Sequence, residues 1–281
     1  MSIAYLNNEF IPLSEAKISV LDRGFIFGDG VYEVIPVYAG RLFRLKEHLQ
    51  RLENSLNGIK LANPLTQTEW ETILNEIIER NGGGDQSVYF QVTRGVAPRK
   101  HYFPKNTPST IFIMSQPFVD PKPSKGIKAV TLPDSRWQHC NIKSIALLAN
   151  VLLTQQAVEN EAGETILIRD GYVTEGASTS VFVVKNGVTS TPPEGQHILS
   201  GITRDLVLET MRAAGEACEE RPILEKELYE ADEIWVTSST REIIPVTMLN
   251  DQQVGNGQPG LIWQKAWQYY QDYKQTLRTT S

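Results

Sequence analysis

Apolar residues recur at helical spacing twice in the first third of the chain. The first stripe predicts a helix that ends near Gly58 and is formed by Leu45, Leu49, Leu52, Leu56 and Ile59. A second helix is predicted from Thr68 and is ended by the run NGGG, with Trp70, Ile73, Leu74, Ile77 and Ile78 on one face. Two amphipathic helices are therefore expected between residues 45 and 84.

Most of the remaining apolar pattern has the two-residue period of strands. YLNNEFI predicts a hairpin around Asn7-Asn8, GVYEVIPVYAGRLFRL predicts two strands around Ala39-Gly40, and Val88, Phe90 and Val92 alternate with polar neighbours. Later, GIKAVTLP, ETILIRDGYVTEG and SVFVVKNGVTS predict strands with Asp-Gly and Asn-Gly hairpin turns. Helices are expected after Lys143, after Thr203 and near the C-terminus. Because strands and helices do not alternate regularly, the pattern favours an α+β fold in two domains.

A proline-rich stretch predicts where these domains meet. The segment SQPFVDPKPSKG, residues 115–126, places three prolines after the strand-like STIFIM, and proline is excluded from helix interiors and central strands. We therefore expect an N-terminal domain over 1–118, a linker over 119–123 and a C-terminal domain over 124–281.

Composition narrows the class of function. The 281 residues are 41% hydrophobic and 21% charged, and a net charge of −6 with a pI near 5.4 argues against nucleic-acid binding. Two cysteines and four histidines show neither a disulfide framework nor metal-ligand spacing, so no metal site is expected. The N-terminus does not have the pattern of a secretory signal, and no apolar run is long enough to span a membrane. These features predict a cytoplasmic enzyme or a binding protein for small molecules.

Lys143, in CNIKSIALLAN, stands among apolar neighbours where lysine is rarely buried. Its stem could pack while the ammonium reaches water. Alternatively, a desolvated amine could form a Schiff base with a carbonyl compound. The local pattern leaves both interpretations open, and the second requires a cofactor site elsewhere in the chain.

Three other stretches supply candidates for such a site. Glu175, in VTEGASTSVF, is either a functional carboxylate or an exposed turn residue. In LSGITRD, Thr203 opens a helix whose start could bind phosphate or be an ordinary cap. VTSSTRE, residues 236–242, matches a capping box and equally an anion-binding nest. GFIFGDGVYE is glycine-rich, but its spacing, with no preceding strand and no following helix, excludes a dinucleotide-binding loop.

Together these stretches resemble the fold-type IV pyridoxal-phosphate enzymes, which include D-amino-acid aminotransferases, branched-chain aminotransferases and aminodeoxychorismate lyases. The resemblance covers nearly the whole chain, in the order DRGFIFGDGVYEV, EHLQRL, NIKS, VTEGASTSVF, SGITRD and VTSSTREIIPV. It implies a smaller N-terminal α/β sandwich domain and a larger, strand-rich C-terminal pseudo-barrel domain.

The resemblance also implies pyridoxal 5'-phosphate as cofactor and a role for each matching residue. Lys143 would form the Schiff base and transfer the proton, and Glu175 would keep the pyridine nitrogen protonated. The phosphate would be bound by four residues: Arg51, Ile202, Thr203 and Thr240. Arg51 lies just off the leucine stripe, where a solvent-facing arginine would also be placed. Ser180 and Ala146 depart from the family, which usually has asparagine at both positions, and this affects cofactor hydrogen bonding rather than the reaction class.

The substrate follows from YFQVTRGVAPRKHYFP. Arg99 and His101 form an R-x-H pair that resembles the carboxylate trap of D-amino-acid aminotransferases, with Tyr32 as third member; a solvated basic loop is the alternative. On a β-like segment, residues two apart point the same way, so Arg99 and His101 could converge on one anion. By resemblance, the pair implies transamination between D-alanine or D-glutamate and pyruvate or 2-oxoglutarate.

Other functions stay open. A branched-chain L-aminotransferase, an (R)-amine transaminase and an aminodeoxychorismate lyase are alternatives within the family, and a non-enzymatic module that binds a phosphorylated ligand is the alternative outside it. The family further implies a homodimer in which the loop with Arg99 and His101 helps to close the neighbouring subunit's pocket.

Overall fold

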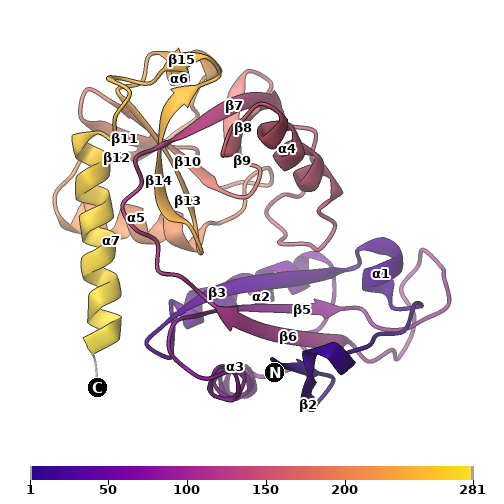
Figure 1. Cartoon of the computed structure of the whole chain (residues 1–281). Coiled ribbons are helices and arrows are strands. Elements are labelled where there is room, and N and C mark those ends of the chain that lie inside the picture. The colour runs from indigo at the N-terminus through magenta and orange to yellow at the C-terminus, as the bar shows by residue number, and fades with distance from the viewer. Residues whose placement is uncertain (1, 280–281) are drawn as a thin grey trace. The chain divides into compact units, whose positions relative to one another are not determined.

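The structure is a computed structural model that describes residues 2–279, and contacts divide these residues into two compact units (Figure 1). Unit 1 comprises 2–120, 142–147 and 277–279, and unit 2 comprises 121–141 and 148–276. The proline-rich residues 118–126 form neither helix nor strand. The domain limits given above stay a prediction.

Unit 1 is built on one antiparallel sheet with the strand order β2-β1-β6-β5-β3-β4. The strands are β1 (Ile3–Leu6), β2 (Glu9–Pro12), β3 (Gly30–Tyr38), β4 (Arg41–Leu42), β5 (Gln86–Thr93) and β6 (Thr110–Pro117). The helices are η1 (Leu13–Glu15), α1 (Arg23–Phe27), α2 (Leu45–Gly58) and α3 (Gln67–Arg80). Asn7-Asn8 and Ala39-Gly40 connect hairpins with positive φ at both residues, as two-residue turns require. The predicted hairpins and both amphipathic helices are confirmed.

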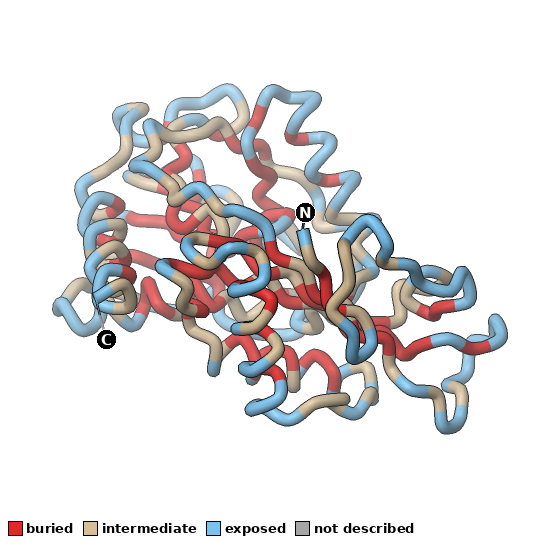
Figure 2. The backbone as a smooth tube through the Cα atoms, turned by 60° about the horizontal axis from the view of Figure 1, so that its bottom comes forward, coloured by how far each residue is buried: buried red, intermediate tan, exposed pale blue. Residues whose placement is uncertain are grey.

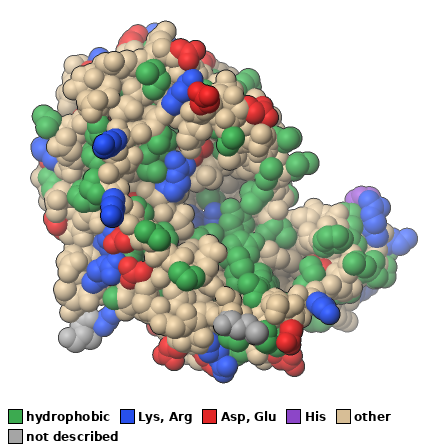
Figure 3. Space-filling model, viewed as in Figure 1, with side chains coloured by type: hydrophobic (Ala, Val, Ile, Leu, Met, Phe, Trp, Pro, Cys, Tyr) green, Lys and Arg blue, Asp and Glu red, His purple; other side chains and the backbone are tan. Residues whose placement is uncertain are grey.

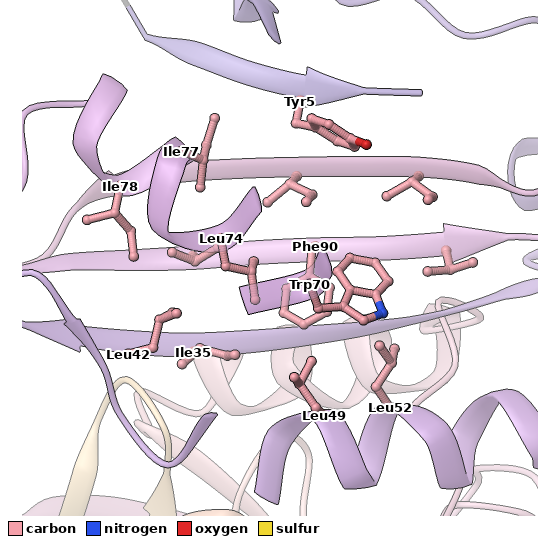
Figure 4. Close-up of a cluster of buried hydrophobic side chains, with 14 of the residues drawn as sticks. Tyr5, Ile35, Leu42, Leu49, Leu52, Trp70, Leu74, Ile77, Ile78 and Phe90 are labelled. Carbon is pink, nitrogen blue, oxygen red and sulfur yellow. The ribbon is translucent and has the colours of Figure 1, made fainter. Parts of the chain in front are cut away.

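The core of unit 1 lies where α2 and α3 cover the sheet (Figure 4). Leu49 and Leu52 enter it from α2 and Trp70 and Leu74 from α3, and Phe90 meets the Trp70 ring at 5.1 Å between centroids. Burying a leucine side chain contributes about 1.5–3 kcal/mol. The apolar stripes seen in the sequence therefore hold both helices on the sheet.

Unit 2 contains a nine-stranded sheet that curls around its own core (Figure 1). Its path is β12-β11-β10-β13-β14-β7-β8-β9, and β15 pairs with β14. The strands are β7 (Ile127–Pro133), β8 (Glu164–Arg169), β9 (Tyr172–Gly176), β10 (Ser180–Lys185), β11 (Val188–Thr191), β12 (Cys218–Glu220), β13 (Glu233–Ser238), β14 (Glu242–Leu249) and β15 (Gln252–Gln253). The helices are α4 (Leu148–Glu159), α5 (Ile202–Ala213), α6 (Glu225–Tyr229) and α7 (Leu261–Thr279).

Parallel and antiparallel pairs are mixed in this sheet. The segments β7-α4-β8 and β11-α5-β12 each join parallel neighbours across a helix, whereas the Asp-Gly and Asn-Gly turns join antiparallel hairpins. The α+β fold and these hairpins are confirmed. Buried residues follow the strands and the inward sides of the helices (Figure 2). Over residues 2–279, no helix has both the length and the apolar character needed to cross a bilayer.

One predicted cap is wrong. After β13 ends at Ser238, residues 239–241 form a turn and the chain returns as β14, with Glu242 opposite Ser238. Glu242 has a left-handed φ of 56°, and its buried carboxylate binds the Lys274 Nζ at 2.8 Å. The carboxylate is therefore used for a buried ion pair rather than for the first N–H groups of a helix.

Candidate active site

The segment with Lys143 completes an open edge of the unit 1 sheet. On that side of β3, β4 pairs only with Val37 and Tyr38, which leaves the first residues of β3 unpaired by a regular strand. Residues 142–147 occupy this edge: the Tyr32 N–H donates to the Lys143 carbonyl at 3.0 Å, and the Ile145 N–H donates to the Gly30 carbonyl at 3.0 Å. Lys143 is thus fixed to unit 1, although the chain before and after 142–147 belongs to unit 2.

The side chain of Lys143 lies against another predicted site residue. Its Nζ is 4.2 Å from the centroid of the Tyr32 ring, which is the distance of a cation–π contact. Its backbone N–H donates to the Ser55 Oγ of α2 at 3.1 Å, and the neighbouring Ile142 packs on the core of unit 1. The structure therefore brings Lys143 and Tyr32 together. The half-buried lysine is held by the Tyr32 ring, by its backbone bond to Ser55 and by the packing of Ile142.

Arg51 is buried rather than solvent-facing. Its Nε and Nη2 donate to the two carboxylate oxygens of Glu33, both at 2.8 Å, and the His48 Nδ1 is 2.8 Å from the same carboxylate. Burial by itself raises the pKa of Glu33, but Arg51 and His48 outweigh it and hold that pKa well below its usual range. The guanidinium is therefore fixed on an ionised carboxylate.

Glu33 and His48 were missed in the sequence, although a signal for them exists. Glu33 follows Val31 and precedes Ile35 in the alternation of β3, so it occupies an inward position in a strand whose other inward residues are apolar. A buried carboxylate needs a partner. His48 and Arg51 are three residues apart and so share one face of α2.

Arg99 and His101 are exposed on an irregular loop, and the expected strand-like alternation is wrong because β5 ends at Thr93. The side chains nevertheless converge. The Arg99 Cζ lies 5.3 Å from the centroid of the Phe27 ring, and the His101 ring lies 5.4 Å from it. Basic side chains gather beside hydrophobic ones at the α1 end of unit 1 (Figure 3). The predicted residues of unit 1 thus comprise the buried Arg51 and two groups, Lys143 with Tyr32 and Arg99 with His101.

Glu175 is buried near the end of β9 in unit 2, so an exposed turn carboxylate is excluded. The Arg136 guanidinium donates to one of its oxygens, and the Leu199 N–H donates to the other at 3.2 Å. Burial raises the pKa of Glu175 to about 7, and Arg136 offsets only part of that effect. No sequence pattern singled out Arg136, which Asp134 orients through bonds of 2.9 Å to Nε and Nη2.

The segment just before α5 contacts Glu175, since Leu199, whose N–H binds this carboxylate, precedes the helix by three residues. The helix begins at Ile202, one residue earlier than predicted, after Gly201. Among the described residues no side chain caps it, so its first N–H groups are available to an anion. A Cβ added at Gly201 would lie 2.5 Å from the Ser180 Oγ. Glycine at this position therefore allows close packing of the helix start on β10.

Thr240 lies in the half-buried turn between β13 and β14. The next residue, Arg241, donates to the Glu164 carboxylate at 3.2 Å, and the same carboxylate accepts the Ala177 N–H at 3.2 Å. Glu164 thus joins the Thr240 turn to the loop that follows Glu175. Unit 2 brings Glu175, the start of α5 and, through this link, the Thr240 turn into one neighbourhood.

A phosphorylated carbonyl cofactor requires four kinds of group, and the chain has all of them. They are a lysine fixed beside an aromatic ring, a buried arginine, a buried carboxyl group with a raised pKa, and a helix start that no side chain of the described residues caps. The family described as amino-transferase class IV matches residues 30–249. The chain belongs to this family and is an aminotransferase.

Relatives with a named activity agree with this class. The chain is 43% identical over 256 residues to a D-alanine aminotransferase from Bacillus licheniformis, with 90% of each chain covered. It is 37% identical over 278 residues to one from Staphylococcus haemolyticus, with 97% of this chain and 98% of the relative covered. Among solved structures, the T.th. branched-chain amino acid aminotransferase with pyridoxamine 5'-phosphate has a TM-score of 0.89 at 26% identity, covering 99% of this chain and 94% of that one. The branched-chain enzyme of Escherichia coli has a TM-score of 0.90 at 25% identity, covering 96% and 94%.

The raised pKa of Glu175 predicts a pH-dependent stability of the cofactor-free protein. Because this pKa is about 7 when folded and about 4.3 in an unfolded chain, the folded protein retains a proton that the unfolded chain releases between these pH values. The unfolding free energy of wild type relative to Glu175→Gln should therefore fall as the pH rises from 5 to 8, by up to about 3 kcal/mol. Urea denaturation of both proteins measures this difference, with Glu79→Gln on the exposed side of α3 as control. A difference in unfolding free energy between wild type and Glu175→Gln that stays constant from pH 5 to 8 would contradict the raised pKa of Glu175.

Proposed function

We propose that this aminotransferase transfers amino groups between D-amino acids and 2-oxo acids with pyridoxal 5'-phosphate. The observation that carries the proposal is the fixed amine of Lys143 beside the Tyr32 ring. The sequence relatives named D-alanine aminotransferases support the choice of substrate, and the solved relative with pyridoxamine 5'-phosphate supports the cofactor.

The cofactor supplies an electrophilic carbonyl and an electron-accepting ring. Lys143 binds it covalently, and its released amine takes the proton from the substrate α-carbon and later returns it. Glu175 holds a proton at the pyridine nitrogen. A carboxyl whose pKa is about 7 because it is buried gains from a cationic N–H partner, so its environment suits this role.

Four residues are proposed to hold the cofactor phosphate. In unit 2, the N–H groups at Ile202 and Thr203 form an uncapped helix start, and the Thr240 hydroxyl adds a donor from the neighbouring turn. In unit 1, Glu33 orients Arg51. An oriented guanidinium suits a dianion, because it donates charge-assisted hydrogen bonds.

Arg99, His101 and Tyr32 are proposed to bind the substrate carboxylate. Arginine donates two parallel hydrogen bonds to a carboxylate, and a fixed carboxylate determines which enantiomer presents its α-hydrogen to Lys143. D-alanine and D-glutamate are the proposed donors, and pyruvate and 2-oxoglutarate the proposed acceptors. Branched-chain L-amino acids are the second candidate, because the solved relatives are titled branched-chain aminotransferases. The lower identity of those relatives and the R-x-H pair favour the D-amino acids.

We also propose that the protein is a homodimer in which Arg99 and His101 reach the pocket of the partner. Exposed apolar residues support self-association, because contiguous apolar patches mark interaction surfaces. They are Leu148, Val151, Leu152 and Val158 on α4, and Phe25, Tyr102 and Phe103 in or beside the Arg99 loop, residues 94–109 between β5 and β6.

The cytoplasm is the proposed location, supported by the free thiols of Cys140 and Cys218.

Replacing the lysine tests the reaction. Lys143→Ala should still bind pyridoxal phosphate but should lose D-alanine transamination by several orders of magnitude, because its amine is both the covalent partner and the proton carrier. Borohydride reduction and peptide mapping of wild type should label Lys143. The exposed Lys46→Ala on α2 is the control and should keep its turnover. An unlabelled Lys143 with bound cofactor would overturn the assignment of Lys143 as the covalent partner.

Replacing Arg99 tests the substrate. Losing a charge-assisted bond to a carboxylate costs about 1.5–3 kcal/mol, so Arg99→Ala should lose about ten- to a hundredfold in kcat/KM for D-alanine. The loss should be much smaller for (R)-phenylethylamine, which has no carboxylate. Arg80→Ala is a matched control, since Arg80 also lies on a phenylalanine ring, that of Phe10. Wild-type preference for L-leucine, or equal losses on amine and amino acid, would overturn the carboxylate assignment.

Mixing two variants tests the homodimer. If Arg99 serves the partner's pocket, a mixed dimer of Lys143→Ala and Arg99→Ala contains one pocket with both native residues. Co-expression of the two chains should then restore D-alanine activity above the level of either variant alone. If Arg99 acts on its own subunit's pocket, or if the protein is a monomer by sedimentation, the mixture shows only the residual activity of Arg99→Ala.

A further inference from the structure

The segment DRGFIFGDG, residues 22–30, has no role in the chemistry above, yet it is hydrogen-bonded to the base of the Arg99 loop. The Arg23 N–H donates to the Gly95 carbonyl at 2.9 Å, and the Arg94 N–H donates to the Asp29 carbonyl at 3.0 Å. The start of the loop is thus held at two points by one short segment that contains α1.

The side chain of Arg23 extends this contact into the loop. It is buried, its Nε pairs with the Asp29 carboxylate at 2.7 Å, and its Nη1 donates to the Lys100 carbonyl at 2.6 Å. Lys100 lies between Arg99 and His101. A buried, charge-paired guanidinium therefore holds the backbone at the centre of the proposed carboxylate-binding pair.

Phe27, at the end of α1, orients the two side chains. The Cζ of Arg99 and the ring of His101 lie 5.3 and 5.4 Å from its ring centroid, and the Cζ of Arg23 lies 4.8 Å from it. Aromatic faces attract guanidinium groups. Since no strand geometry aligns Arg99 with His101, the Phe27 ring is the contact that the two side chains share.

The same segment contacts the Lys143 segment on its other side. Gly28 has a φ of +67°, and a Cβ added there would lie 3.0 Å from the Ala146 side chain. The Gly30 carbonyl accepts the Ile145 N–H at 3.0 Å. Residues 22–30 therefore join the amine-bearing segment and the Arg99 loop of one chain in a single hydrogen-bonded body.

We propose that Arg23 and Phe27 are positioning residues that hold Arg99 and His101 ready for the substrate carboxylate, and that they thereby set the selectivity for amino acids over amines without a carboxylate. This inference rests on the proposed function. It assigns the selectivity to residues that act through Arg99 and His101.

The test is Phe27→Leu, which removes the ring but keeps an apolar side chain. In single-turnover half-reactions, the apparent Kd for D-alanine should rise about five- to tenfold, the size of a lost cation–π contact. The limiting rate should stay within about twofold, as should both parameters for (R)-phenylethylamine. Phe27→Tyr retains the ring and should restore the wild-type Kd. Phe10→Leu is the matched control, because its ring also carries an arginine, Arg80, whose Cζ lies 4.4 Å from the ring centroid.

Hydrogen exchange provides a readout that does not depend on activity. Amides of residues 95–103 should exchange faster in Phe27→Leu holoenzyme than in wild type or Phe10→Leu. Arg23→Lys, which keeps the charge beside Asp29 but not the forked donor, should shift the exchange and the Kd in the same direction.

The outcomes separate this inference from the proposed function. Unchanged exchange in both variants overturns the positioning role, and faster exchange with an unchanged Kd for D-alanine overturns the role in selectivity. In both cases, wild-type turnover of D-alanine leaves the proposed function intact. Wild type that does not act on D-alanine overturns the proposed function and the selectivity together. A fall in the limiting rate for both donors means that the ring acts on the reaction itself, which also overturns the proposal.

Discussion

The backbone pairing of residues 142–147 with the open edge of β3 is the interaction on which the candidate site depends. Two hydrogen bonds, from Tyr32 to Lys143 and from Ile145 to Gly30, fix a lysine whose flanking chain belongs to the other unit. An unpaired strand edge readily accepts a further strand, so the sheet that builds the core of unit 1 also provides the docking position. The side chain of Lys143 then meets Tyr32, the residue whose N–H makes the first of these bonds.

Each unit contains a buried candidate carboxyl group, and the partners of each group decide its charge. Glu33 accepts two bonds from Arg51 and stays ionised, whereas Glu175 has Arg136 and one backbone N–H and titrates near neutral pH. Removing one partner from a buried pair leaves an uncompensated charge, which costs about 3–5 kcal/mol. The two glutamates therefore suit different tasks, Glu33 to orient an arginine and Glu175 to share a proton with a ligand.

Sequence patterns predicted helices and turns correctly where these depend on residues close together in the chain. The leucine stripe of α2 and the two-residue turns at Asn7-Asn8 and Ala39-Gly40 follow from periodicity and from residues that tolerate positive φ. The cap expected at 239–242 failed because Lys274, distant in sequence, takes the Glu242 carboxylate. Contacts between remote segments, such as those of Arg136 with Glu175 and of Phe27 with Arg99, have no local signature. They could only be found once the fold brought these residues together.

The glycine-rich stretch at 24–30 does not have the spacing of a dinucleotide-binding loop, but its glycines have a role in packing. Gly28 and Gly30 let neighbouring segments approach, since an added Cβ would lie 3.0 Å from Ala146 or 2.7 Å from the Val92 carbonyl. Larger residues there would separate β3 from β5 or from the Lys143 segment. Close packing at these glycines, with Arg23 and Phe27 beside them, links the Lys143 segment and the Arg99 loop through residues 22–30. The proposed covalent amine and the proposed carboxylate anchor are thus both carried by segments that are hydrogen-bonded to a stretch with no proposed reactive group of its own.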